Sequence, residues 1–258
     1  MNYQFDFTIR KFSELLNAFL DKGYEFQTLE EFIHKPSAKV AILRHDVDRL
    51  PVSSLNTAKL ENALGIRGTY YFRIVKHSNH PRIIEEVAAL GHEIGYHYED
   101  LTLSNGIFEQ AILSFEANLT YFRTFYPVKT ICMHGSPVSK WDNRDLWKKY
   151  SYRDYGIMAE PYFDLNFDEM LYLTDTGRRW NGDKSSVRDK ILNKRYNDLK
   201  KGLKTSDNIL QAISGDELPG KLMVTVHPQR WTDQVVPWLK EYFVQAFKNR
   251  IKQMIFVR

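Results

Sequence analysis

The apolar run that begins at Val40 ends in two aspartates, Asp46 and Asp48, separated by a single residue. The run has the length and composition of a buried strand, in which residues two apart point to the same side. Two carboxylates at the end of a buried strand take up protons unless a cation or hydrogen-bond donors compensate them. The pair therefore indicates a divalent metal site, where one carboxylate binds the ion and the other takes a proton from an attacking water.

Four further strand-like segments end in a histidine or an aspartate, at His97, His134, Asp175 and His227. In parallel α/β proteins the carboxyl ends of the strands build the active site, and a mixture of His and Asp suits a transition metal, most often Zn²⁺. The alternatives are structural, because an Asp can cap a helix or form a salt bridge and a lone His is often a core residue. His45 is expected to face away from the two aspartates, in a supporting role.

The chain has 258 residues, with 43% hydrophobic and 26% charged residues, which is ordinary for one globular domain over residues 1–258. The net charge of +4 is mild, and much of the excess lies in residues 188–204. We interpret that run as a solvated helix face, with a patch for an anionic sugar nucleotide or lipid phosphate as the alternative. Nucleic-acid binding has little support from this composition.

The single cysteine, Cys132, excludes an intrachain disulfide framework and lies in an apolar segment, which favours a buried structural thiol over a nucleophile. The amino terminus lacks the apolar core of a signal peptide, and the chain has no 18-residue apolar run. We therefore expect a cytoplasmic protein that does not span a membrane.

Segments with helical and strand-like periodicity alternate along the chain, which predicts parallel strands joined by helical crossovers. We expect an α/β fold, a distorted (β/α) barrel of about seven parallel strands with outer helices, and a flat doubly wound sheet is the alternative. Helices are predicted over residues 9–23, 52–64, 81–90, 108–126, 144–150, 186–204 and 232–252. Strands are predicted over residues 40–48, 67–74, 92–98, 129–134, 156–159, 169–175, 222–227 and 253–257.

Two motifs carry a family resemblance. The segment Arg44-His-Asp-Val-Asp48 resembles the Thr-Phe-Asp-Asp motif of the NodB-homology polysaccharide deacetylases, carbohydrate esterase family 4, with one residue inserted between the acids. The segment Gly91-His-Glu-Ile-Gly-Tyr-His97 resembles the second motif of the same family. The resemblance spans residues 40–230 and implies that Asp46 is the catalytic base, Asp48 a metal ligand and His97 the first ligand histidine.

The chain departs from the family where the second ligand histidine would fall, because Leu101 occupies that position. Either a carboxylate, Glu99 or Asp100, takes the third ligand position, or His134 reaches in from the next strand end. We prefer His134, with Glu99 as the alternative. The two residues that follow in the chain, Gly135 and Ser136, are candidates for contacts to substrate or oxyanion, although an ordinary turn explains them equally well.

The later family motifs are matched more loosely. The segment from Asp175 to Trp180 stands in place of the fourth motif, and the resemblance implies substrate-binding roles for Asp175, Arg179 and Trp180. The strand ending at His227 resembles the fifth motif, so His227 is expected to be the general acid. Tryptophans beside the polar segments, among them Trp141, suit sugar stacking, although most aromatics belong to the core.

The resemblance implies that the chain is a metal-dependent carbohydrate deacetylase, which hydrolyses C–N bonds other than peptide bonds or acetyl esters. The expected cofactor is a divalent transition metal, with Zn²⁺ as the first candidate. We expect an N- or O-acetylated sugar precursor of a surface polysaccharide such as O-antigen or capsule, with peripheral contact to a lipid-linked substrate. The alternatives are a non-catalytic carbohydrate-binding relative and a glycosyltransferase that uses Asp46 and Asp48 as an Asp-x-Asp site. The histidines argue against the transferase, because a phosphate-bound ion prefers oxygen ligands.

Overall fold

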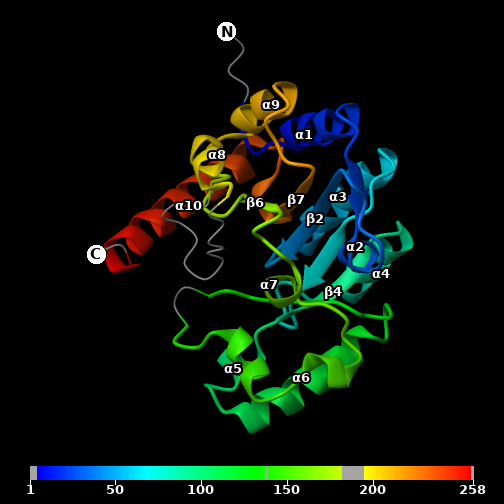
Figure 1. The fold of residues 1–258 in the computed structure, drawn as a ribbon. Coiled ribbons are helices and arrows are strands. Elements are labelled where there is room, and N and C mark those ends of the chain that lie inside the picture. Colours follow the sequence, from blue (N-terminus) through cyan, green and yellow to red (C-terminus); the bar gives the residue numbers. More distant parts are fainter. Residues whose placement is uncertain (1–4, 137–138, 182–194, 257–258) are drawn as a thin grey trace.

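The computed structural model describes residues 5–136, 139–181 and 195–256 and contains one parallel sheet that curls into a half-barrel, with helices around it (Figure 1). This confirms the expected distorted (β/α) barrel. The seven strands are β1 (Glu25–Gln27), β2 (Val40–Val47), β3 (Thr69–Phe72), β4 (Glu93–Tyr98), β5 (Ile131–Met133), β6 (Leu171–Thr174) and β7 (Lys221–Val226).

Strand β2 lies at the centre of the sheet. The strand order is β5-β4-β3-β2-β7-β6, with β1 paired to β2, and every pairing is parallel. Asp46 lies opposite Tyr71 of β3, and His45 lies opposite Val226 of β7. The carboxyl end of β2, which carries the two aspartates, therefore opens between the ends of its two neighbours.

Five of the seven predicted helices, those expected from residues 9, 52, 81, 108 and 144, begin within one residue of an observed helix. Residues 9, 81 and 108 each begin a helix as expected, and the helix predicted over residues 144–150 is a 3₁₀ helix. The helices are α1 (Ile9–Asp21), α2 (Leu29–His34), α3 (Pro51–Ala63), α4 (Pro81–Ala89), α5 (Asp100–Leu103), α6 (Phe108–Phe122), η1 (Asn143–Lys148), η2 (Tyr152–Tyr155), α7 (Pro161–Asp164), α8 (Asn197–Gly202), α9 (Ser206–Ser214), η3 (Pro228–Arg230) and α10 (Val235–Phe256).

Three predicted elements differ from the structure. The strand expected over residues 253–257 is wrong, because helix α10 continues through Phe256 and overrides the local preference of an Ile-Phe-Val run for strand. Residues 156–159 form only an isolated bridge, between Ala159 and Thr130. Of the helix predicted over residues 186–204, the structure shows only α8, and residues 186–194 lie outside the described part of the chain. Several elements were not predicted at all, among them the short strand β1 and helix α9, whose Ile209, Ala212 and Ile213 are buried.

The interior of the curled sheet is filled by large side chains, one or more from most strands. Ile42, Tyr71, Cys132, Tyr172 and Met223 pack together there and are buried. The residues adjacent to them on each strand point outward into two other apolar clusters, one under α3, α4 and α6 and the other under α1 and α9. Because side chains alternate along a strand, each strand covers both faces of the sheet.

This alternation decides which polar residues reach the interior. Arg44 and Asp46 lie two and four residues after Ile42, so they share its interior side, and both are buried. Gly95 leaves the space that this arrangement needs, since a Cβ atom there would lie 2.2 Å from the ring of Tyr71. A larger residue at position 95 would push that ring toward the polar end of the barrel.

Candidate metal and catalytic site

Three imidazoles surround the carboxylate of Asp48, which follows the carboxyl end of β2. The Nε2 atom of His134 lies 3.5 Å from Oδ1 of Asp48, and that of His97 lies 3.8 Å from the same oxygen. The Nε2 atom of His227 lies 3.7 Å from Oδ2. The structure thus brings together four residues from the carboxyl ends of β2, β4, β5 and β7, with all three Nε2 atoms toward one carboxylate.

The Nδ1 atoms of two of these histidines, His97 and His134, each contact an oxygen acceptor on the side away from Asp48. The Nδ1 atom of His97 lies 2.9 Å from the carbonyl oxygen of Cys132, and that of His134 lies 3.0 Å from Oε2 of Glu99. Glu99 is itself fixed by two bonds from the guanidinium of Arg73, at 2.8 and 2.7 Å. An acceptor on Nδ1 leaves Nε2 available as a lone-pair donor, which is the usual orientation of a metal-binding imidazole.

The third imidazole is fixed by Asp175, which lies at the end of β6. Oδ1 of Asp175 lies 2.5 Å from Nδ1 of His227 and accepts a bond from Arg230, also at 2.5 Å. Oδ2 accepts from the indole N–H of Trp231 and from the backbone N–H of His227, both at 2.9 Å. Burial opposes charge on His227, but Asp175 outweighs it and the pKa of His227 is raised. The imidazole is therefore suited to donate a proton near neutral pH.

Asp46 is held by a guanidinium from its own strand. Arg44 donates from Nε to Oδ1 at 2.8 Å and from Nη2 to Oδ2 at 2.6 Å, and both side chains are buried. Burial alone would raise the pKa of Asp46, but Arg44, together with His97 and His227, lowers it. The bidentate pair fixes the carboxylate in its charged form, with the Nε2 atom of His97 3.8 Å from Oδ2.

The ionisation of Asp48 and His97 also suits metal binding. Burial disfavours charge on Asp48, but its pKa is lowered by the neighbouring imidazoles, His134 first. Burial lowers the pKa of His97 to about 4, so this imidazole is neutral at physiological pH. A charged carboxylate and a neutral imidazole are the forms that bind a metal ion.

The residues fit a divalent ion at Asp48. Oδ1 of Asp48 is buried and has no hydrogen-bond partner among the described residues. Two ligand atoms that share a tetrahedral Zn²⁺ at about 2.0–2.2 Å are roughly 3.4 Å apart, close to the 3.5 to 3.8 Å from the Asp48 oxygens to the three imidazoles. Oδ1 of Asp48 thus faces imidazole nitrogens without a hydrogen bond from the described residues to satisfy it, as expected of a carboxylate that shares a metal ion with histidines.

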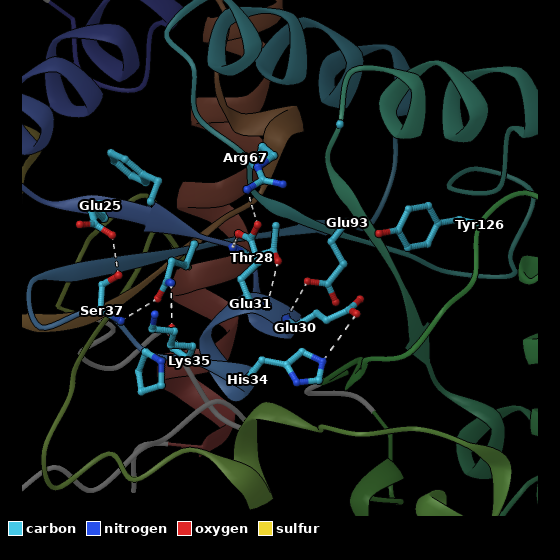
Figure 2. A pocket seen from close by; sticks show the side chains of 14 residues that line it. Glu25, Thr28, Glu30, Glu31, His34, Lys35, Ser37, Arg67, Glu93 and Tyr126 are labelled. Carbon is cyan, nitrogen blue, oxygen red and sulfur yellow. Dashed lines mark hydrogen bonds and ion pairs between the residues drawn. The ribbon is translucent and has the colours of Figure 1, made fainter.

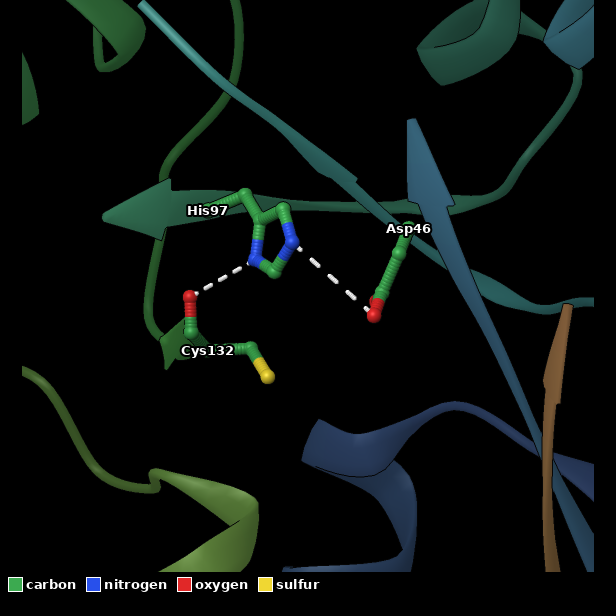
Figure 3. A group of neighbouring side chains, drawn as sticks. All are labelled: Asp46, His97 and Cys132. Atoms are coloured by element: carbon green, nitrogen blue, oxygen red, sulfur yellow. Dashed lines mark hydrogen bonds and ion pairs between the residues drawn. The ribbon is translucent and has the colours of Figure 1, made fainter. Parts of the chain in front are cut away.

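A second group of possible ligands overlaps with this one. Single ligand atoms of Asp46, His97 and Cys132 all lie within 4.8 Å of one another, and Figure 3 shows the His97 ring between the other two residues. The thiol was expected to be structural, so the sequence did not indicate this group. Because Arg44 already engages both oxygens of Asp46, we favour the ligand group around Asp48.

The alternative third ligands lie outside the ligand positions. Glu99 stands behind His134 rather than in its place. Asp100 points to the outer side of the sheet, where it accepts bonds from Tyr96 at 2.7 Å and from residues of α6. His45 also faces outward, as expected, with Nε2 2.8 Å from Glu61 of α3. These positions leave His134 as the candidate for the third ligand, beside Asp48 and His97.

The expected substrate contacts have mixed outcomes. Gly135 and Ser136 follow His134 directly and are half-buried, and Arg179 lies at the surface. Trp180 is a core residue, because its ring is buried between α1 and α9 and its N–H donates to Ser206 at 2.9 Å. Asp175 is engaged by His227 and its neighbours, so it positions that imidazole rather than a substrate.

Several residues of the site carried no signal that we recognised in the sequence. Arg44 was detectable, since it lies two residues before Asp46 on the same side of a predicted strand. Arg73 and Arg230 follow strands in ordinary loop sequences, and their partners, Glu99 and Asp175, are remote in the chain. Pairing between distant segments depends on the fold and cannot be read from local sequence.

A pocket of about 710 Å³ lies at the opposite end of the barrel, where the strands begin (Figure 2). Its carboxylates have partners. Buried Glu93 accepts bonds from the backbone N–H of Glu30 at 3.0 Å, from Thr69 at 2.9 Å and from Thr130. Glu31 pairs with Arg67. This end therefore lacks the unpaired carboxylate found at Asp48.

Comparisons with known proteins add little to this geometry. No family model matches the sequence, and no curated protein matches it. Among solved structures, the chain is similar to the Xyl-CE4 domain of a multidomain xylanase from the hindgut metagenome of Trinervitermes trinervoides. The TM-score is 0.37 and the identity 14%, over 83% of this chain and 85% of that one. A similarity of this size is compatible with a curled parallel half-barrel and carries no inference about function.

Proposed function

We propose that the chain is a metal-dependent hydrolase that removes an acetyl group from an N- or O-acetylated sugar. The observation that carries the proposal is the carboxylate of Asp48, which has no hydrogen-bond partner among the described residues and faces the Nε2 atoms of His97, His134 and His227. A carboxylate that faces several imidazole nitrogens is ordinary in a metal site. Asp48, His97 and His134 would hold the ion, and Zn²⁺ suits this donor set.

The remaining polar residues have the properties that hydrolysis needs. A bound divalent ion supplies a Lewis acid for the acetyl carbonyl and lowers the pKa of water. Asp46, kept charged by Arg44, would accept the proton that the attacking water loses. As the bond between the acetyl carbon and the sugar nitrogen or oxygen breaks, His227 donates a proton to the leaving sugar atom. The products are acetate and the deacetylated sugar.

The proposal also specifies the substrate class, an N- or O-acetylated sugar. The support for this class is the resemblance of the first two motifs to carbohydrate deacetylases, together with the proximity of Asp46 and His227 to the group around Asp48. We further propose a sugar precursor of a surface polysaccharide as substrate. A non-catalytic carbohydrate-binding protein on the same fold is the alternative, because the position of the second family histidine holds Leu101.

The first experiment measures metal binding, since it needs no substrate. Wild-type protein is stripped with a chelator, reconstituted with Zn²⁺ and analysed for bound metal beside Asp48→Asn and His134→Gln. We expect about one equivalent in the wild type and an affinity at least about 100-fold lower in both variants. His34→Gln is the matched control, because His34 is an exposed histidine at the opposite end of the barrel. Cys132→Ser distinguishes the ligand group around Asp48 from the group formed by Asp46, His97 and Cys132. It should retain the metal if the ion binds at Asp48.

The second experiment measures acetate release from UDP-N-acetylglucosamine, N-acetylated chitooligosaccharides and O-acetylated xylooligosaccharides. Acetate from one of these, lost in Asp48→Asn, would establish the hydrolase. Release of nucleotide without acetate would instead indicate a transferase. A reconstituted protein that holds no metal, or that holds it equally well in Asp48→Asn, would contradict the proposed site. Bound metal without acetate release from any acetylated sugar would favour the binding protein.

A further inference from the structure

Helix α10 presents an apolar face to solvent. Val236, Leu239, Phe243 and Phe247 lie at spacings of three and four residues, which places them along one side of the helix, and they are 41 to 76% exposed. We call these four residues the apolar face of α10. Figure 1 shows the carboxyl-terminal part of α10 extending beyond the other described helices and strands. A contiguous exposed apolar face of this kind usually marks an interaction surface.

The opposite side of α10, which packs on the rest of the protein, combines polar residues with the ring of Trp238, whose centroid lies 4.9 Å from that of the Phe5 ring. Buried Glu241 forms an ion pair with Arg49. Asn249 donates to the carbonyl of Gly177 at 2.9 Å and accepts from Gln245 at 2.8 Å. A helix that served only to cover the core would bury its apolar side and expose its polar side. The apolar face is not covered by the described part of this chain.

The exposed charges beside the apolar face are positive. Lys240 lies one turn from Val236 and Phe243, and Arg250 lies one turn from Phe247. Glu241, the single acid in the sequence of α10, is engaged by Arg49 on the other side, and Lys248 adds a further exposed cation. Two copies of this helix packed face to face would bring like charges together, whereas an anionic surface would complement them.

We propose that α10 docks the protein on an anionic lipid surface, lying in the plane of the headgroups with its apolar face inserted. Among the described residues no helix is long and apolar enough to cross a bilayer, so α10 would lie on the membrane and not span it. Apolar insertion and attraction between Lys or Arg and anionic headgroups together provide the two contributions that stable but reversible binding needs.

The position of α10 connects this surface to the candidate site. Arg178, three residues after Asp175, lies over the ring of Trp238 at 4.6 Å, and Gly177 accepts the bond from Asn249. The segment that follows β6 is therefore held between His227 and α10. Docking through α10 would bring the edge of the candidate site close to the headgroups. The inference stands on α10 itself and does not depend on the hydrolase.

The test uses full-length protein and sedimentation with vesicles of phosphatidylcholine alone or with an equal amount of phosphatidylglycerol. We expect binding to the anionic vesicles that weakens when ionic strength rises to about 0.5 M. The double variant Phe243→Ser/Phe247→Ser should bind at least about tenfold more weakly, since two rings are lost from the inserted face. The variant Lys240→Glu/Arg250→Glu tests the charge. Leu113→Ser is the matched control, because Leu113 is an exposed apolar residue on α6.

Light scattering on the same proteins provides the competing outcome. A dimer in the wild type that becomes a monomer in Phe243→Ser/Phe247→Ser would show that a second copy covers the apolar face, and it would overturn the proposal. Absence of sedimentation with anionic vesicles, or equal sedimentation of wild type and the phenylalanine variant, would overturn it as well. Circular dichroism establishes that each variant is folded. Metal content separates this test from the proposed function, since the α10 variants should retain bound Zn²⁺.

Discussion

Both ends of the barrel carry carboxylates, but the carboxylates of the two ends differ in their hydrogen-bond partners. Where the strands begin, Glu93 receives hydrogen bonds from two threonine hydroxyls and a backbone N–H. Where the strands end, Asp48 faces three imidazole nitrogens at 3.5 to 3.8 Å, and its Oδ1 has no hydrogen-bond partner among the described residues. Composition alone does not distinguish these ends, because each combines acids with histidine or arginine.

The difference lies in where the donors point. At the amino ends of the strands three donors are directed at the oxygens of Glu93, so the carboxyl group and the donors satisfy one another. At the carboxyl ends the carboxylates of Glu99 and Asp175 do not contact Asp48. They contact the Nδ1 atoms of the imidazoles, as Glu99 does for His134 and Asp175 for His227. The second arrangement orients lone pairs toward a common point and leaves that point for an ion. The arrangement around Glu93 stabilises the fold, whereas the arrangement around Asp48 is suited to bind an ion.

The largest expected effect separates proton transfer from metal binding. If an acetylated sugar is identified as substrate, His227→Ala should lower kcat/KM for acetate release by about 10²–10⁴, because the leaving group loses its proton donor. Asp46→Asn should have an effect of the same order, since the base is lost. Both variants should still bind Zn²⁺ with an affinity within about tenfold of wild type. Loss of metal in His227→Ala would make this histidine a ligand instead of the acid.

The next effect tests the contrast between the two ends directly, by the free energy of unfolding of the metal-free protein in urea. Glu93→Ala should destabilise it by about 2–4 kcal/mol, because three buried donors lose their acceptor. Asp48→Ala should destabilise it by less than Glu93→Ala does, because it removes the attraction between the carboxylate and the imidazoles but no hydrogen bond among the described residues. Equal destabilisation by the two substitutions would show that Asp48 is a structural carboxylate.

The sequence was informative where function depends on local periodicity. The spacing of Asp46 and Asp48, and the polar ends of the strands that carry His97, His134 and His227, follow from alternation along each strand and from the shared edge of a parallel sheet. These regularities do not depend on the identity of the loops. The curled parallel sheet was predictable for the same reason, since alternating periodicities determine how strands are connected.

The rest of the site depends on contacts that cross the sheet. Whether Asp175 would contact a substrate or hold His227 was decided by register between β6 and β7 and by the loop that carries Arg230. Trp180 looked like a rim residue because of its neighbours in sequence, yet its side chain points into the core beneath α1. Helix α10 was recognised only in part, because the Ile-Phe-Val run at its end has the composition of a strand.

The smallest expected effect concerns the charge on His227. Asp175 raises the pKa of this imidazole, while Arg230, 2.5 Å from Asp175, opposes the increase. A general acid works in its protonated form, so kcat/KM for acetate release should fall as pH rises through this pKa. Arg230→Gln removes a positive charge beside the imidazole and thus raises the pKa, which should move the alkaline limb of the profile to higher pH by up to about one unit. Arg230→Lys keeps the charge and should leave the limb in place. A shift to lower pH in Arg230→Gln would mean that Arg230 acts mainly by holding Asp175 against His227, and a limb unchanged in both variants would assign the pH dependence to another group.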